Sequence, residues 1–204
     1  MPDAHSALET VYEPGSFGSH GVGGPGVTLA ERRGVALVQV AAWDSDGETL
    51  RTALATATGV DVPARPDTTA TGGTTSVLWA GPARWLVMRP GTHGWDLERE
   101  LRDALGEADA GVVDVSMGRT LVRLSGPATR RVLAKGCAVD LHPDAFPPGE
   151  VRLTALGHVS VAIHVADSSP TADVIVARSL AVSLWEWLCE AAREDGCRVG
   201  EPTG

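Results

Sequence analysis

From residue 27 onward, apolar and polar positions of this 204-residue chain repeat with two recognisable periods. Alternating or continuous apolar runs bounded by glycine, proline or charged residues indicate β-strands. These runs lie at 34–43, 76–81, 84–91, 112–126, 151–156, 158–167 and 171–178. The run 112–126 is one long strand, or two strands joined by a kink at Gly118. Residues 63–75 are polar and predict a loop.

Apolar residues at helical spacing predict four helices. They lie at 47–59, 95–105, 128–135 and 179–194. The third has Gly126-Pro127 before its first turn and Gly136 after its last, an asymmetry typical of helix ends. In the fourth, Trp185 falls within the apolar arc and Trp187 at its edge.

The predicted order is β-α-β-β-α-β, followed by β-α-β-β-β-α. Two split βαβ-type halves of this kind favour an α+β fold, with mainly antiparallel sheets and helices packed on one face. We expect a single α+β domain over residues 27–194, with an architectural pseudo-repeat of 27–115 and 116–194. Residues 1–26 are rich in Gly, Pro and Ser and predict a flexible arm, and 195–204 form a tail.

A glycine pattern in the arm matches a dinucleotide-binding fingerprint by letter only. Residues 21–26 read GVGGPG, and Asp44 and Asp46 follow about 20 residues later, as that motif requires. No apolar strand precedes Gly21, however, and the seven residues after Gly26 are too few for a crossover helix. We interpret the pattern as part of the flexible arm. Nucleotide binding that depends on residues 1–26 is the alternative.

Charge and composition narrow the class of protein. The formal net charge is −9, with no basic patch beyond short arginine doublets, which disfavours nucleic-acid binding. No apolar run approaches the roughly 20 residues of a membrane span, and the N-terminus lacks the basic and apolar regions of a secretion signal. The three cysteines include no CxxC pair. A soluble, cytoplasmic protein is expected.

The stretch AKGCAVDLHPDAFPPGE, residues 134–150, gathers the residue types of a metal or catalytic loop. Only Cys137 and His142 are good zinc ligands, and no second Cys/His pair lies nearby, whereas zinc sites usually need four. Asp140 and Asp144 suit turns, where a carboxylate accepts local backbone N–H groups. We therefore favour an ordered structural or contact loop, without a metal.

Two further groups of polar residues are candidates for chemistry. His158 and His164 alternate with apolar residues of one strand and are expected on the more polar side of its sheet, at a surface or interface. In DVSMGR (114–119), Asp114 and Arg119 predict a hydrogen-bonded brace, with anion or substrate binding by Arg119 as the alternative. Neither group provides a nucleophile with a base, so the residues alone indicate no catalytic site.

Several segments resemble the gamma subunit family of heterotetrameric sarcosine oxidase. They are VTLAERRGVALVQV (27–40), LWAGPARWLVMRPG (78–91), VVDVSMGRTLVRLSGPATRRVLAKGCAVDLHPDAFPPG (112–149) and RSLAVSLWEWLCEAA (178–192). The resemblance implies an accessory gamma chain that contacts or stabilises the large subunit, beside alpha, beta and delta subunits. It implies that the complex demethylates sarcosine oxidatively to glycine, releases hydrogen peroxide and passes the one-carbon unit to tetrahydrofolate. FAD, FMN and NAD are then held by the large subunits, and this chain binds no cofactor.

The same resemblance implies a fold similar to the folate-binding T-protein of glycine cleavage, which DVSMGRTLVRLSGP also resembles. T-proteins often have a histidine where this chain has Met117, and their Asn-Gly-Gly and catalytic aspartate region has no match here. Folate-dependent transfer is therefore not carried over. A stand-alone folate-binding or aminomethyltransferase-like protein is the alternative. The expected subunit-interface residues are Arg119, Asp140, His142, Phe146, Pro147, Trp185 and Trp187.

Overall fold

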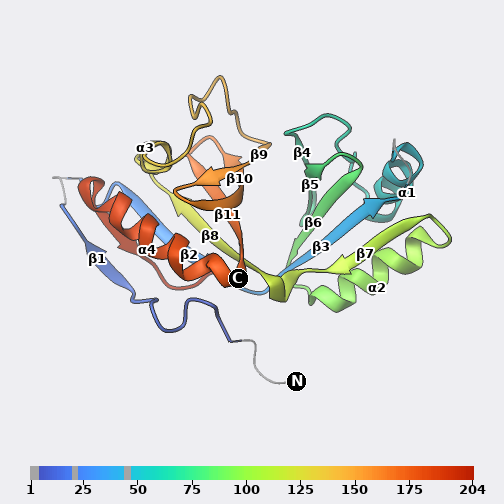
Figure 1. Ribbon diagram of the computed structural model, residues 1–204, viewed down its shortest axis with the longest axis horizontal. Helices are drawn as coiled ribbons and strands as arrows, with labels where there is room; N and C mark the ends of the chain where they lie inside the picture. Colours follow the sequence, from blue (N-terminus) through green and yellow to red (C-terminus); the bar gives the residue numbers. More distant parts are fainter. Residues whose placement is uncertain (1–4, 20–22, 44–46) are drawn as a thin grey trace. The chain divides into compact units, whose positions relative to one another are not determined.

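The structure, a computed structural model, describes residues 5–19, 23–43 and 47–204. The chain forms two compact units. Unit 1 combines the N-terminal part of the chain up to Arg33 with residues 117–203, and unit 2 is formed by 34–116. Unit 2 is thus inserted into the chain of unit 1. Each unit contains one sheet and two α-helices among the described residues (Figure 1).

Unit 1 is built on a seven-stranded sheet. Its spatial order is β1 (Gly15–Phe17), β12 (Cys197–Val199), β2 (Val27–Arg32), β8 (Arg119–Ser125), β11 (Thr171–Ala177), β10 (Val159–Asp167) and β9 (Glu150–Leu156). Neighbouring strands are antiparallel except β12 and β2, which are parallel. The helices are α3 (Thr129–Ala134) and α4 (Ala181–Ala192), accompanied by the 3-10 turns η2 (Arg178–Leu180) and η3 (Arg193–Asp195). A further 3-10 turn, η1 (Ser116–Gly118), begins with the last residue of unit 2 and continues into unit 1.

The core of unit 1 lies between one face of this sheet and its helices. Alternate strand residues such as Val122, Ile163 and Val174 are fully buried there, together with Leu184 and Leu188 of α4. Because successive strand residues point to opposite faces, this alternation assigns one face of the sheet to the core. Burial of these aliphatic side chains, each worth about 1.5–3 kcal/mol, is the main force that holds α4 against the sheet.

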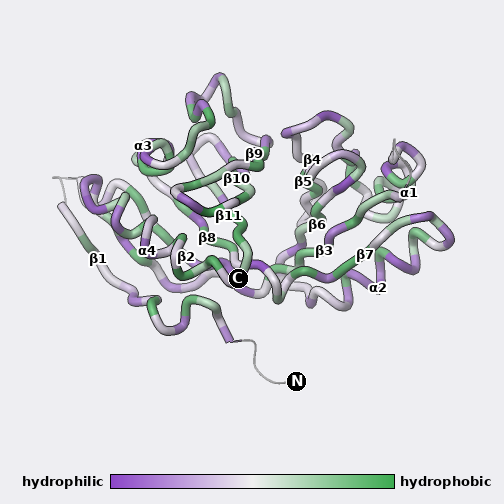
Figure 2. Tube along the Cα trace, in the orientation of Figure 1, coloured by the Kyte–Doolittle hydropathy of each residue, from purple (hydrophilic) through white to green (hydrophobic). Residues whose placement is uncertain are grey.

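Unit 2 has a five-stranded, fully antiparallel sheet. Its order is β4 (Thr69–Gly72), β5 (Thr75–Gly81), β6 (Arg84–Pro90), β3 (Val35–Ala42) and β7 (Ala110–Asp114). The helices α1 (Glu48–Thr58) and α2 (Gly94–Leu105) bury Leu54, Leu97 and Leu101 against one face. Figure 2 shows the hydrophobic positions that recur along β3, β6 and β7.

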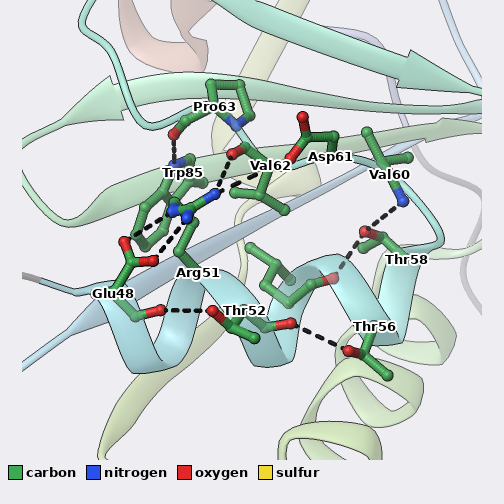
Figure 3. A network of polar contacts seen from close by, with 11 residues as sticks. Glu48, Arg51, Thr52, Thr56, Thr58, Val60, Asp61, Val62, Pro63 and Trp85 are labelled. Carbon is green, nitrogen blue, oxygen red and sulfur yellow. Dashed lines mark hydrogen bonds and ion pairs between the residues drawn. The ribbon is translucent and has the colours of Figure 1, made fainter.

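The ends of α1 are fixed by glycine and by a polar network (Figure 3). Gly59 ends the helix in the left-handed conformation, at φ 67°, and its N–H donates to Ala55 O. Arg51 pairs with Glu48 in the first turn and also donates to the carbonyl of Val62. Trp85 of β6 is buried and donates its indole N–H to Pro63 O at 2.8 Å, which anchors the following loop.

The expected fold class is confirmed, because both units are mainly antiparallel sheets with helices on one face. The kink at Gly118 is a 3-10 turn that separates β7 from β8. Strand β4 was missed inside the polar loop 63–75; it is a short hairpin partner of β5 with little apolar content. Strand β2 belongs to the sheet of unit 1, although it precedes β3 in the chain.

Parts of the predicted arm (1–26) and of the predicted tail (195–204) are folded into unit 1. Leu8 is fully buried in the core, and β1 pairs with β12, which lies in the expected tail. We call residues 5–12 the N-terminal strap. The start of the glycine pattern (residues 21 and 22) and both Asp44 and Asp46 lie outside the described residues. Within the described ranges, no helix has the length and apolar character needed to cross a bilayer.

Candidate functional site

The 134–150 stretch is an ordered loop of unit 1 that is anchored from inside. Leu141 is buried and Phe146 is fully buried in the core. Arg130 of α3 donates to both of their carbonyl oxygens, at 2.7 Å to Leu141 O and 2.9 Å to Phe146 O. The guanidinium of Arg152 lies over the Phe146 ring, 4.6 Å from its centroid. Arginine side chains thus satisfy the backbone carbonyls of Leu141 and Phe146 in this loop.

The acidic residues and the histidine of this loop make local contacts. Asp140 accepts the backbone N–H of His142 at 2.9 Å, and His142 Nδ1 accepts that of Asp144 at 3.3 Å. The first is the turn-forming bond that the sequence predicts for a short acidic residue, whereas in the second the acceptor is the histidine ring and Asp144 contributes its backbone N–H. Cys137 is half-buried and contacts Thr154 Oγ1 at 3.9 Å. Over the described ranges, no three His, Cys, Asp or Glu residues are grouped as a metal site would need.

The seven residues predicted to lie at a subunit interface differ in how far their side chains are exposed to solvent. Arg119, Asp140 and His142 are exposed, and Pro147 is partly exposed. Phe146 and Trp185 lie inside the core, with 0% and 2% of their surface accessible, so their side chains do not present a contact surface. Both are large apolar groups on inward-facing positions, which explains the difference.

Trp187 is half-buried and packs across two glycines. A Cβ atom at Gly136 would overlap the Trp187 ring, and one at Gly157 would press on its five-membered ring. Gly157 also has φ +61° and donates its N–H to Gly136 O. The glycine before the 137–149 loop is therefore required by close packing against an aromatic ring.

In the DVSMGR turn, Asp114 and Ser116 make hydrogen bonds that stabilise unit 2. Asp114 Oδ1 accepts both the N–H and the hydroxyl of Ser116, at 2.8 and 2.5 Å. Ser116 Oγ in turn accepts the N–H of Leu37 on β3 at 2.9 Å. A side chain at Gly94, where α2 begins, would overlap both polar groups. The expected brace from Asp114 to Arg119 stays a prediction, because Arg119 belongs to unit 1.

The structure corrects the placement of one of the two histidines predicted in the strand 158–167 and places the other, His158, in the turn before β10. His158 is exposed as expected, but His164 is buried, with 6% of its surface accessible. His164 lies directly opposite Asp173 in the β10–β11 ladder, and its Nδ1 has no hydrogen-bond partner. Burial lowers the pKa of His164, and Arg123 and Arg32 lower it further, against the opposing effect of Asp173.

Asp173 is the centre of a buried ion-pair cluster that sequence reasoning missed. It is fully buried and accepts two hydrogen bonds from Arg123, at 2.8 and 2.7 Å, and one from Arg32 at 2.9 Å. Hydrogen bonding to Asp173 raises the pKa of Arg123. The only signal for this cluster was a charged residue, Asp173, inside the apolar strand TADVIVAR. Buried charges of this kind must be paired.

The N-terminal strap is a second feature that the sequence did not indicate. The Tyr12 ring stacks on Trp185 with a centroid distance of 4.8 Å. Its hydroxyl accepts the N–H of Glu31 at 3.0 Å and donates to Gly200 O at 2.9 Å. The strap thus connects α4, β2 and the C-terminal segment within unit 1.

The thiols of Cys189 and Cys197 are not poised for nucleophilic chemistry. Burial raises the pKa of Cys189 to about 11 and that of Cys197 to about 12. Both therefore stay protonated near neutral pH, and the thiolate is the reactive form.

The fold of this chain is similar to that of an aminomethyltransferase of known structure. The aminomethyltransferase T of the glycine cleavage system from Bartonella henselae superposes with a TM-score of 0.63. The match covers 88% of this chain and 48% of that protein at 15% identity, so it shows a common fold alone. The T-protein-like architecture expected from the sequence is confirmed.

The chain belongs to the sarcosine oxidase gamma subunit family, which matches residues 43–194. Sarcosine oxidase subunit gamma from Corynebacterium sp. strain P-1 is 42% identical over 87 residues, which cover 43% of this chain and 42% of the relative. The protein of the same name from Corynebacterium sp. strain U-96 is 38% identical over 116 residues, 56% of each chain. These alignments thus span about half the length of the curated relatives.

A solved structure matches over almost the whole chain. It is the heterotetrameric sarcosine oxidase from Corynebacterium sp. U-96 in complex with pyrrole 2-carboxylate. The TM-score is 0.78 at 29% identity, and the superposition covers 93% of this chain and 95% of the matched chain.

Proposed function

We propose that this chain is an accessory, non-catalytic subunit that stabilises the large subunit of a cytoplasmic heterotetrameric sarcosine oxidase. The observation that carries the proposal is the match of residues 43–194 to the gamma subunit family, together with a superposition of 93% of this chain on a chain of a heterotetrameric sarcosine oxidase. The complex would demethylate sarcosine oxidatively to glycine, with release of hydrogen peroxide and transfer of the one-carbon unit to tetrahydrofolate. FAD, FMN and NAD would be held by the alpha and beta subunits, and a delta subunit would complete the assembly.

The contacts of the candidate residues support a structural role. Ser116 and Asp114 hold β3 and the start of α2, and Asp140 and His142 shape a loop. Each of these groups is engaged by the chain's own backbone. The exposed members of the expected set, Arg119, Asp140 and His142, together with Pro147, are our proposed contact residues for the large subunit.

Omission of this chain tests the accessory role. The four subunits should be co-expressed with and without it, and the melting temperature of the large subunit and peroxide release on sarcosine should be measured. We expect the complex without this chain to melt at a lower temperature and to lose activity as the large subunit unfolds. An equally stable and active complex would contradict the role.

The alternative function is a stand-alone folate-binding or aminomethyltransferase-like protein, which the T-protein fold favours. It requires a folate site in this chain alone. Calorimetric titration of the isolated chain with a reduced folate distinguishes the two, since the accessory role predicts no saturable heat.

A further inference from the structure

Unit 1 carries a pocket beside the N-terminal strap that none of the contacts above explains. Its volume is about 540 Å³, and its lining includes Ala7, Gly118, Arg178 and Ser179. The strap contributes one side, and the turns η1 and η2 contribute the other. A volume of this size lies in the range that accommodates small groups or the side chains of a partner.

Arg178 gives this pocket a cationic wall. Its Nη2 donates to His5 O on the strap at 2.7 Å, which fixes the direction of the guanidinium. Within the described part of the chain, Arg178 makes no ion pair, unlike Arg123 or Arg152. A guanidinium has five N–H donors, so most of its hydrogen-bonding capacity remains for a ligand.

In both turns an exposed apolar residue is the sequence neighbour of a residue that lines the pocket. Met117 precedes Gly118 and is 57% exposed, and Leu180 follows Ser179 and is 40% exposed. Both are among the exposed large hydrophobic residues of the chain. Gly118 has no atom within 4 Å of a Cβ position, so open space lies beside it. An arginine with adjacent exposed apolar side chains is the composition that interface centres favour.

We propose that this pocket receives an aspartate or glutamate side chain of a partner subunit, paired with Arg178. The inference rests on the proposed function, since it assumes that the chain docks on other subunits. The two oxygens of a carboxylate match the planar guanidinium fork, and an apolar neighbour of the acidic residue would cover Met117 and Leu180. On a chain of net charge −9, an unpaired cationic pocket also selects one orientation of an acidic partner surface.

The first test measures how fast this chain leaves the assembled complex. Complexes are co-expressed, immobilised through a tag on another subunit, and washed while release of this chain is followed. Arg178→Glu reverses the charge, and Gly118→Leu fills the pocket at a position whose φ is not in the left-handed region. We expect both variants to dissociate about thirtyfold faster or more. The control is Arg65→Glu in unit 2, an exposed arginine that, like Arg178, makes no ion pair with the described residues, and this variant should dissociate like the wild type.

The outcomes separate this inference from the proposed function. If the wild-type chain is not captured with other subunits, the proposed function fails. If it is captured, but Arg178→Glu and Gly118→Leu dissociate as slowly as the wild type, the pocket inference alone is wrong. Equal acceleration by Arg65→Glu would also overturn it, because the effect would then follow net charge and not this site.

A second measurement identifies the occupant directly. A photo-crosslinking amino acid replaces Ser179, and the complex is irradiated and digested. We expect a cross-linked peptide of another subunit that contains Asp or Glu. A cross-link to a peptide without an acidic residue, or no cross-link to another subunit, would contradict the proposal even if the variants fold poorly.

Discussion

The buried carboxylate of Asp173 makes the sharpest prediction about stability. It has no accessible surface and accepts three charge-assisted hydrogen bonds, two from Arg123 and one from Arg32. Asp173→Asn keeps the shape of the side chain but removes its charge. The guanidinium groups would then remain at a buried site without their counter-ion, a loss that costs about 3–5 kcal/mol in comparable buried pairs.

How far the two arginine side chains can reach water decides where in this range the loss of stability falls. The side chain of Arg123 is 34% exposed and can turn toward water, whereas that of Arg32 is only 8% exposed. We therefore expect a loss near the lower end, about 3 kcal/mol, which lowers the folded-to-unfolded ratio roughly a hundredfold.

Urea unfolding followed by tryptophan fluorescence measures this loss, because Trp185 lies in the core of the same unit. The matched control is Asp140→Asn, which removes an exposed carboxylate that accepts a single backbone N–H and should cost less than about 1 kcal/mol. A loss below about 1 kcal/mol for Asp173→Asn would refute the reasoning.

Three further predictions concern the same unit. Gly136→Ala should destabilise it by about 1–3 kcal/mol because the new methyl overlaps Trp187, whereas Gly118→Ala faces open space; equal melting temperatures for the two would contradict this. Because burial lowers the pKa of His164 below the unfolded value of about 6.5, the unfolded state binds more protons, and the free energy of unfolding should fall as pH falls below that value. In the His164→Gln variant the free energy of unfolding should fall less steeply as the pH is lowered. The same pH dependence in the variant and the wild type would contradict this prediction. Tyr12→Phe should cost about 1–2 kcal/mol and speed proteolysis within the strap, since its hydroxyl makes two hydrogen bonds; unchanged cleavage would count against the strap's role.

The sequence predicted most elements because their apolar periods were long. The strands of 84–91 and 171–178 and the helices of 95–105 and 179–194 lie within a few residues of their expected bounds. Strand β4 was missed because Thr69–Gly72 has almost no apolar residue, and its pairing with β5 defines it. The strap was missed because its few apolar residues, of which Leu8 alone is fully buried, form no helical or strand period.

The candidate site was predictable only where contacts are local. The turn-forming role of the Asp140 carboxylate follows from His142, two residues away, whereas Asp144 takes part in the turn through its backbone N–H, which donates to the His142 ring. The burial of His164 does not follow from such near neighbours, because it depends on Asp173 and Arg123, which come from two other strands. Alternation placed His164 on the correct face, but that face is buried at this position.

Membership of the gamma subunit family makes assembly with other subunits the central claim. The most direct measurement is purification of the tagged chain from its own host grown on sarcosine, with identification of co-eluting proteins and a visible spectrum. The account predicts three partner subunits, a flavin spectrum and peroxide release on sarcosine, and a colourless, inactive chain once the partners are removed. A chain that elutes alone from sarcosine-grown cells would contradict it.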